Sequence, residues 1–176
     1  MSGLARERHR SLRGASWAAA ALVFVTVATS GCSRQEEAQV NESMTLMQAK
    51  AETQELERSI VDAFPSDQVA AVEQRQEGVL LSCSDDQYQW TGGVEFTLAG
   101  DLSDRDVAER VVGALESKDG WSSEVQDWKD GGPTAIVSGP QGLSFIGNLD
   151  ADRLVTIASA SRCFTLSEDQ SPFSKY

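Results

Sequence analysis

Histidine is almost absent from this chain of 176 residues: the only one is His9, close to the N-terminus. Ser-His-Asp and Cys-His catalysis both use an imidazole as general base, and the common zinc sites use histidine ligands. A four-cysteine zinc site is excluded as well, because the chain has three cysteines. Since no other catalytic spacing is present, we expect a protein that is not an enzyme and that holds no metal and no cofactor.

The sequence also lacks an apolar run long enough for a transmembrane helix. Its longest uncharged apolar run, residues 15–29, has about fifteen residues, whereas a helix needs about 20 to span a bilayer. Four arginines precede this run. A basic segment followed by a short apolar one is typical of a secretory signal peptide, which delivers the rest of the chain to the outside. Residues 1–31 are therefore predicted to be a signal peptide.

The apolar run ends in Thr29-Ser30-Gly31-Cys32. These residues resemble the end of bacterial lipoprotein signal peptides, in which small residues precede an obligatory cysteine. Thr29 departs from that pattern, because Leu, Val or Ala is commoner at its position. By the resemblance, Cys32 would be diacylated on sulfur and would become the new N-terminus, and two acyl chains anchor a protein stably. The alternative is ordinary cleavage after Ser30, with Ala28 and Ser30 as the small residues.

Positive charge is scarce after the signal. Residues 33–176 keep 11 Lys/Arg and 26 Asp/Glu, which gives a net charge of −15. A surface this acidic repels nucleic acid and anionic lipid headgroups. We therefore expect no nucleic-acid partner. Binding of a cation or a basic partner is one interpretation of the acidity, and solubility outside the cell is the simpler one.

Two cysteines remain besides Cys32, namely Cys83 and Cys163. In an oxidising compartment such a pair predicts a disulfide. Closing a loop of about eighty residues stabilises a fold by roughly 4 kcal/mol in the chain-entropy model. A redox or metal role is the alternative, but the CxxC spacing is missing.

Two stretches have the apolar spacing of amphipathic helices. Residues 32–40 are polar and predict a tether, after which Asn41 is a candidate N-cap for a helix that ends before Pro65. Ser103 is a candidate N-cap for a second helix, with Asp106 completing a capping box. The apolar stripe of the first helix consists of Leu46, Ala49, Thr53, Leu56, Ile60, Ala63 and Phe64.

Short stretches bounded by turn residues predict strands. A Gly92-Gly93 pair within one of them is a candidate bulge. The last four strands have only short turns between them, whereas parallel strands need long crossovers. We therefore expect an α+β fold at residues 41–166: a two-layer sandwich with a mostly antiparallel sheet of five to six strands and two helices on one face, followed by a flexible tail at residues 167–176. The candidate strands are residues 69–76, 79–83, 88–98, 122–129, 134–138, 143–148 and 153–166.

Four aromatic residues form the candidate ligand or partner patch, because aromatic side chains are favoured at interfaces. They are Tyr88, Trp90, Trp121 and Trp128. Packing of the sheet against the helices is the alternative role for them.

Carboxylates near the turns give no catalytic or metal-binding pattern. Residues 101–109 (DLSDRDVAE) lack the mid-loop Gly of a calcium loop. Asp127, Asp130, Asp150 and Asp152 could in principle pair as general acid and base. Their positions at hairpin turns are explained by turn chemistry instead.

The motifs together resemble a family of small exported proteins. A cysteine after a signal, a long helix, VLLSC, a hydrophobic strand, a capped helix and the closing GPQGLSFIGNLDADRLVTIASASRCF are similar to the actinobacterial lipoproteins of the LppA-like kind. That resemblance implies an α/β sandwich on the cell surface, and it implies no enzyme activity and no catalytic residues.

These inferences predict a non-enzymatic surface domain, anchored by lipid on Cys32 to the outer face of the cytoplasmic membrane. Such a domain would bind a protein or a cell-envelope component. The alternative is a carrier of a small apolar ligand at the membrane surface, with a pocket between the helices and the sheet.

Overall fold

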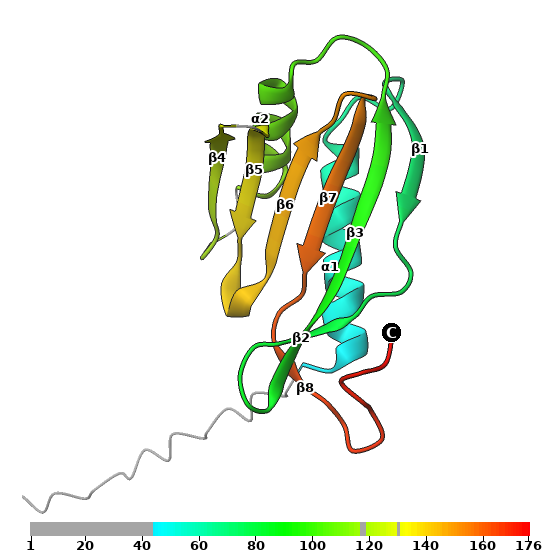
Figure 1. The fold of residues 1–176 in the computed structure, drawn as a ribbon, viewed down its shortest axis with the longest axis vertical. Coiled ribbons are helices and arrows are strands. Elements are labelled where there is room, and N and C mark those ends of the chain that lie inside the picture. Colours follow the sequence, from blue (N-terminus) through cyan, green and yellow to red (C-terminus); the bar gives the residue numbers. More distant parts are fainter. Residues whose placement is uncertain (1–43, 117–118, 130) are drawn as a thin grey trace, which may run out of the picture. The chain divides into compact units, whose positions relative to one another are not determined.

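The computed structural model describes residues 44–116, 119–129 and 131–176. The predicted signal at residues 1–31, the tether at residues 32–40 and the lipidation site Cys32 lie outside these residues. The described chain forms two helices and an eight-stranded sheet (Figure 1). None of its helices has the length and apolar character needed to cross a membrane.

Helix α1 (Leu46–Asp62) begins at Thr45, whose hydroxyl accepts a hydrogen bond from the backbone N–H of Gln48. The Gln48 side chain in turn accepts from the Thr45 backbone N–H, which completes a capping box. The predicted cap Asn41 lies outside the described residues. The Thr-x-x-Gln pattern at residues 45–48 marks the start of this helix in the sequence.

The predicted apolar stripe of α1 is buried, and one charged residue lies within it. Leu46, Ala49, Thr53, Leu56 and Ile60 are buried as expected, and the fully buried side chain of Glu57 joins them.

Helix α2 (Asp104–Leu115) begins where the sequence predicts. Ser103 is its N-cap, and Asp106 accepts hydrogen bonds from the Ser103 backbone and hydroxyl. These hydrogen bonds hold the pKa of Asp106 below its ordinary value. Val107, Ala108, Val111 and Leu115 form the buried face of the helix.

The strands form one antiparallel sheet in the order β1-β3-β7-β6-β5-β4, and β2 and β8 pair with β3 off this path. The α+β class and the two-layer arrangement are confirmed. The sheet has more strands than the expected five to six, because β2 and β8 are short additions along the first half of β3. The strands are β1 (Val69–Gln74), β2 (Leu80–Ser82), β3 (Gln87–Leu98), β4 (Ser122–Trp128), β5 (Gly132–Ser138), β6 (Ser144–Leu149), β7 (Leu154–Ala160) and β8 (Phe164–Thr165).

The predicted bulge lies in a different strand. Gly92 and Gly93 pair in regular register with Ser159 and Ala158 of β7, so β3 has no bulge there. The register shifts instead in β1, between Ala70 and Glu73. Packing requires glycine at position 92, because a Cβ there would lie 2.2 Å from the Trp90 ring.

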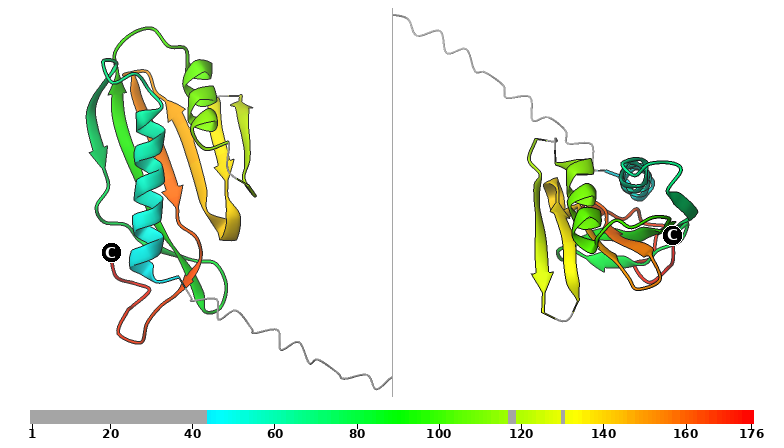
Figure 2. Two further views of the ribbon diagram at one scale, coloured as in Figure 1. Left: turned by 180° about the vertical axis from the view of Figure 1, so that it is seen from behind. Right: turned by 90° about the horizontal axis from the view of Figure 1, so that it is seen from above.

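Both helices cover the same face of the sheet, and the other face carries no helix (Figure 2). The main core lies between the helices and the sheet and contains Phe96, Phe145 and Val111. A second cluster, formed by Leu46, Ala49, Trp90 and Phe164, fills the end where α1 begins and where β2 and β8 join β3. We call this end the α1-start end.

The segment after β8 folds back onto the domain in this structure. The backbone N–H of Tyr176 donates to Gly78, and its backbone oxygen accepts from Gly78 and from the Trp90 indole N–H. The Tyr176 side chain packs against the second cluster. Residues 167–176, expected to be a flexible tail, therefore contact the fold through Tyr176.

Candidate functional site

The four candidate aromatic residues lie in separate regions, with Tyr88 and Trp90 together and Trp121 and Trp128 elsewhere. Trp90 is fully buried in the second cluster, and Tyr88 packs at its edge. Trp121 stacks on Phe145 with ring centroids 6.3 Å apart, while Trp128 is 53% exposed. Strands β3 and β4 are separated by three other strands, which at about 4.8 Å per strand places them about 19 Å apart. The structure therefore does not bring these side chains into one patch.

The cysteine pair is joined. Cys83 and Cys163 form a disulfide with their Cα atoms 6.3 Å apart. It links the turn after β2 to the residue before β8, next to the second cluster. The bond therefore closes the α1-start end, and it serves as a covalent staple there.

The candidate carboxylates at turns have structural partners. Asp150 accepts hydrogen bonds from the backbone N–H groups of Asp152 and Leu154. Asp127 forms an ion pair with Arg105 of α2 at 2.6 Å. Asp150 has the turn role that the sequence predicts, whereas Asp127 lies within β4 and pairs with a residue of α2 instead.

The middle of the helix-free side of the sheet, formed by strands β5, β6 and β7, lacks charge. Strands β5, β6 and β7 contain no Asp, Glu, Lys or Arg, in a chain in which 24% of residues are charged. We call the side chains that these three strands direct away from the helices the open face. They are Thr134, Ile136, Ser138, Ser144, Ile146, Asn148, Leu154, Thr156, Ala158 and Ala160.

Two isoleucines lie in the middle of the open face. Ile136 and Ile146 are direct cross-strand partners, and Ile146 is 50% exposed. Across the sheet the same row continues to Glu124 on one side and to Ala158 on the other. The row thus presents an apolar centre with a carboxylate on one side and a small uncharged residue on the other.

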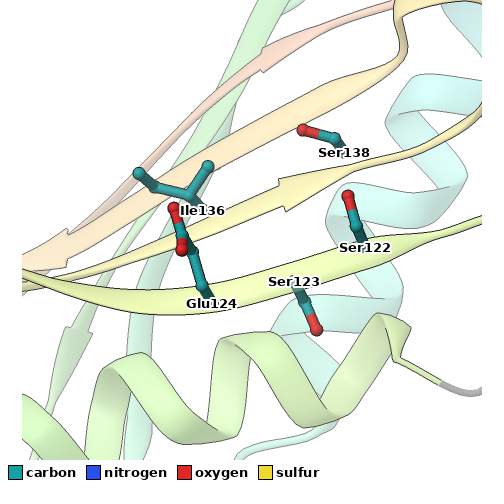
Figure 3. A pocket seen from close by; sticks show the side chains of 5 residues that line it. All are labelled: Ser122, Ser123, Glu124, Ile136 and Ser138. Atoms are coloured by element: carbon teal, nitrogen blue, oxygen red, sulfur yellow. The ribbon is translucent and has the colours of Figure 1, made fainter.

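A shallow hollow of about 260 Å³ lies where the open face meets β4. Figure 3 shows Ser122, Glu124, Ile136 and Ser138 pointing to the same side of the sheet, while Ser123 points toward α2. The hollow offers hydroxyl groups and one carboxylate beside an isoleucine.

A second concave feature, the α1–β1 groove, lies between helix and edge strand on the other side of the sheet. It has a volume of about 340 Å³ and is lined by Arg58, Val61, Asp62, Val72, Gln74 and Val94. Ligand pockets commonly begin at about 300 Å³ and combine apolar walls with a few polar groups. The groove meets that description at the lower end of the size range.

The bulge in β1 shapes this groove. Ala71 has a φ of +49°, in the left-handed region that residues with a Cβ rarely adopt. The neighbouring Val72 is 49% exposed and lines the groove. Bulges of this kind re-aim side chains, and backbone strain of this kind clusters at functional sites.

Glu57 lies behind the groove and has no exposed surface. The Gln74 amide, which lines the groove, donates to Glu57 Oε2 at 2.7 Å, and Ser159 Oγ donates to Glu57 Oε1 at 2.5 Å. Burial raises the pKa of Glu57 above its ordinary value, and these two hydrogen bonds oppose the rise.

Neither concave feature was found from the sequence. Two signals were available: the uncharged run at residues 131–149, and Glu57 at helical spacing from Thr53 and Ile60 on an otherwise apolar stripe. The first predicts strands that keep charge off both faces, and the second predicts a buried acid.

Comparison of the chain with protein family models, with curated protein sequences and with solved structures found no match. The resemblance to LppA-like lipoproteins therefore stays a prediction.

Proposed function

We propose that this protein is a non-enzymatic, lipid-anchored surface domain that binds a protein or a cell-envelope component through its open face. The observation that carries the proposal is the complete lack of charge on strands β5, β6 and β7. A typical soluble surface is about 25–35% charged, and the centres of protein interfaces are depleted of charge.

The geometry of the open face suits a broad contact. Antiparallel sheets commonly carry polar and charged side chains on the solvated face. Within β5, β6 and β7 the neighbours of Ile136 and Ile146 on this face are serine, threonine, asparagine and alanine, and the carboxylate of Glu124 borders them on β4. Hydroxyl and amide groups give adaptable hydrogen bonds to a partner. The isoleucines supply the apolar centre, because fully burying such a side chain is worth about 1.5–3 kcal/mol.

A site-specific photo-crosslinker tests where the partner docks. Placed at Ile146 in intact cells, it should give adducts of one defined mass. The same group at Ala51, an exposed residue on the outer side of α1, is the control and should give none of that product. Equal products from the two positions would refute docking at the open face, and a product of twice the chain's mass would identify the occupant as a second copy.

The anchor has its own test. Intact mass of the protein from the membrane fraction should show a diacyl addition on Cys32, and Cys32→Ser should release the protein from that fraction. A mature chain that starts at Gly31 without lipid would refute the anchor.

The α1–β1 groove supports a second candidate function, a carrier of a small apolar ligand. Val61, Val72 and Val94 supply apolar walls, and Arg58 and Asp62 supply polar groups. The probe is anilinonaphthalene sulfonate, whose binding to wild type is compared by equilibrium dialysis with binding to Val72→Arg and Ala51→Arg. Ala51 is an exposed residue of α1 outside the groove. Loss of binding in Val72→Arg alone supports the carrier, and equal binding in all three proteins eliminates it.

A further inference from the structure

Exposed large apolar side chains gather at the α1-start end. Four of them lie on the elements that enclose the second cluster: Met47 in the first turn of α1 is 66% exposed, Val79 and Leu81 of the β2 region are 48% and 50% exposed, and Phe173 is 96% exposed. Figure 1 shows the start of α1, β2, β8 and the segment after β8 together at the lower end of the domain.

Their surroundings hold these side chains outward. Val79 and Leu81 flank Leu80, which packs into the second cluster, so the alternation of a strand directs both away from it. Phe173 lies between Ser171 and Tyr176, and the Tyr176 hydroxyl donates to the Ser171 carbonyl and accepts from the Ser171 N–H. These hydrogen bonds between Ser171 and Tyr176 therefore fix both ends of the segment that carries Phe173, while the Phe173 ring faces solvent.

The number of residues between Cys32 and the folded domain limits how far the α1-start end can lie from the lipid on Cys32. Met44, the first described residue, packs against the second cluster, and eleven residues separate it from Cys32. A chain of that length spans at most about 40 Å. If Cys32 carries the lipid, as the proposed function holds, the α1-start end stays within that distance of the bilayer surface.

We infer that the α1-start end contacts the bilayer, with Phe173 and Leu81 inserted at the level of the headgroups. This inference rests on the proposed lipid anchor, and it adds a second, apolar contact made by the folded domain itself. Interfacial binding of this kind uses aromatic and aliphatic side chains. The anchor makes the contact intramolecular, so that a weak apolar contact is sufficient.

The charges at this end determine which bilayer suits it. Asp85 and Asp86 lie in the turn between β2 and β3, and Glu168 and Asp169 follow β8, against Lys50 and Lys175. These carboxylates are repelled by anionic headgroups. The contact is therefore apolar in origin, favours zwitterionic lipid, and on anionic lipid strengthens as salt screens the repulsion.

The test uses the mature lipidated protein, purified from membranes and placed in phosphatidylcholine vesicles. Phe173→p-benzoylphenylalanine carries a photo-crosslinker, and Trp128→p-benzoylphenylalanine is the control, because Trp128 is also exposed but lies on the far edge strand β4. We expect about tenfold more lipid adduct from position 173. The free energy gained by burying an aromatic ring is larger than the free energy that corresponds to a tenfold ratio. Adduct formation should fall when anionic phosphatidylglycerol is added and recover with salt.

Two measurements on the same sample separate the possible failures. Intact mass reports the diacyl group on Cys32, and photo-crosslinking reports the contact. A lipidated chain that gives equal or no lipid adducts at positions 173 and 128 overturns the contact and leaves the anchor standing. A chain without the diacyl group overturns both. Because Phe173 is almost fully exposed, its replacement leaves the fold intact, which circular dichroism verifies.

Discussion

Ser159 Oγ donates a hydrogen bond to Glu57 Oε1 across 102 residues of sequence and joins α1 to β7 in the interior of the domain. Gln74 of β1 binds the other carboxylate oxygen. A single buried acid thus connects one helix to two strands, and it borders the α1–β1 groove. Burial disfavours its charged form, which raises its pKa.

Glu57 makes stability depend on pH in a definite direction. Between the ordinary value of 4.5 and the raised pKa of the folded state, the native protein binds more protons than the unfolded chain. The free energy of unfolding therefore falls as pH rises through this range. Glu57→Gln removes the titration. Its free energy of unfolding should therefore increase relative to that of wild type as pH rises above 4.5.

Denaturant unfolding of both proteins over this pH range measures the difference. Ser159→Ala serves as a second variant, because it removes one partner of the buried acid and should destabilise the protein by about 1–3 kcal/mol. Parallel pH curves for wild type and Glu57→Gln would contradict the assignment.

Two glycines give a matched pair for testing the packing. A Cβ at Gly92 would lie 2.2 Å from the Trp90 ring and 3.0 Å from Glu57 Oε1. Gly92→Ala should therefore destabilise the protein by about 1–3 kcal/mol. Gly113 lies in α2 with nothing within 4 Å of the added carbon, so Gly113→Ala should stabilise it by about 0.5–1 kcal/mol. Thermal unfolding of the two variants checks the signs, and a stable Gly92→Ala protein would be inconsistent with this packing.

The disulfide should contribute strongly to stability. Cys83 and Cys163 are separated by 80 residues, and the chain-entropy model gives about 4 kcal/mol for a loop of this length. Replacing both cysteines by serine should lower the free energy of unfolding by about that amount. Urea unfolding of the double variant measures it, and an unchanged midpoint would mean that the bond does not constrain the unfolded chain.

Local rules predicted much of the fold. Ser103 and Asp106 mark the start of α2, and the turns near Asp150 separate hairpin strands, because capping and turn chemistry depend on neighbouring residues. The disulfide was predicted from the number of cysteines and from the expected export of the chain. The helix start and the turns depend on little beyond the local sequence, whereas the disulfide joins residues that are 80 positions apart.

Several other features that depend on distant contacts were not predicted. The last strand was expected to run through residues 153–166, but it divides into β7 and β8, and Ser161 between them donates its backbone N–H to Trp90. The bulge was expected at Gly92, whereas that residue makes room for Trp90 and Glu57. Trp90 and Trp121 were expected together, but the strand order separates them. Each outcome is set by partners far away in the sequence.

The open face could have been suspected but not located. The uncharged run at residues 131–149 is visible in the sequence. Which side of β5 and β6 remains uncovered depends on where α1 and α2 pack, and that is a tertiary property.

The most direct test of the proposed binding role introduces one charge on the open face. Ile146→Lys places an ammonium group at its centre, and Ala51→Lys adds the same charge on the outer side of α1. Both residues are exposed, so both variants should fold with little change in stability. Crosslinked complexes are recovered from intact cells and quantified by mass spectrometry. We expect Ile146→Lys to lower the yield at least about tenfold, because a desolvated unpaired charge costs more than 1.4 kcal/mol, while Ala51→Lys retains the wild-type yield. Equal yields from the two variants would contradict binding through the open face.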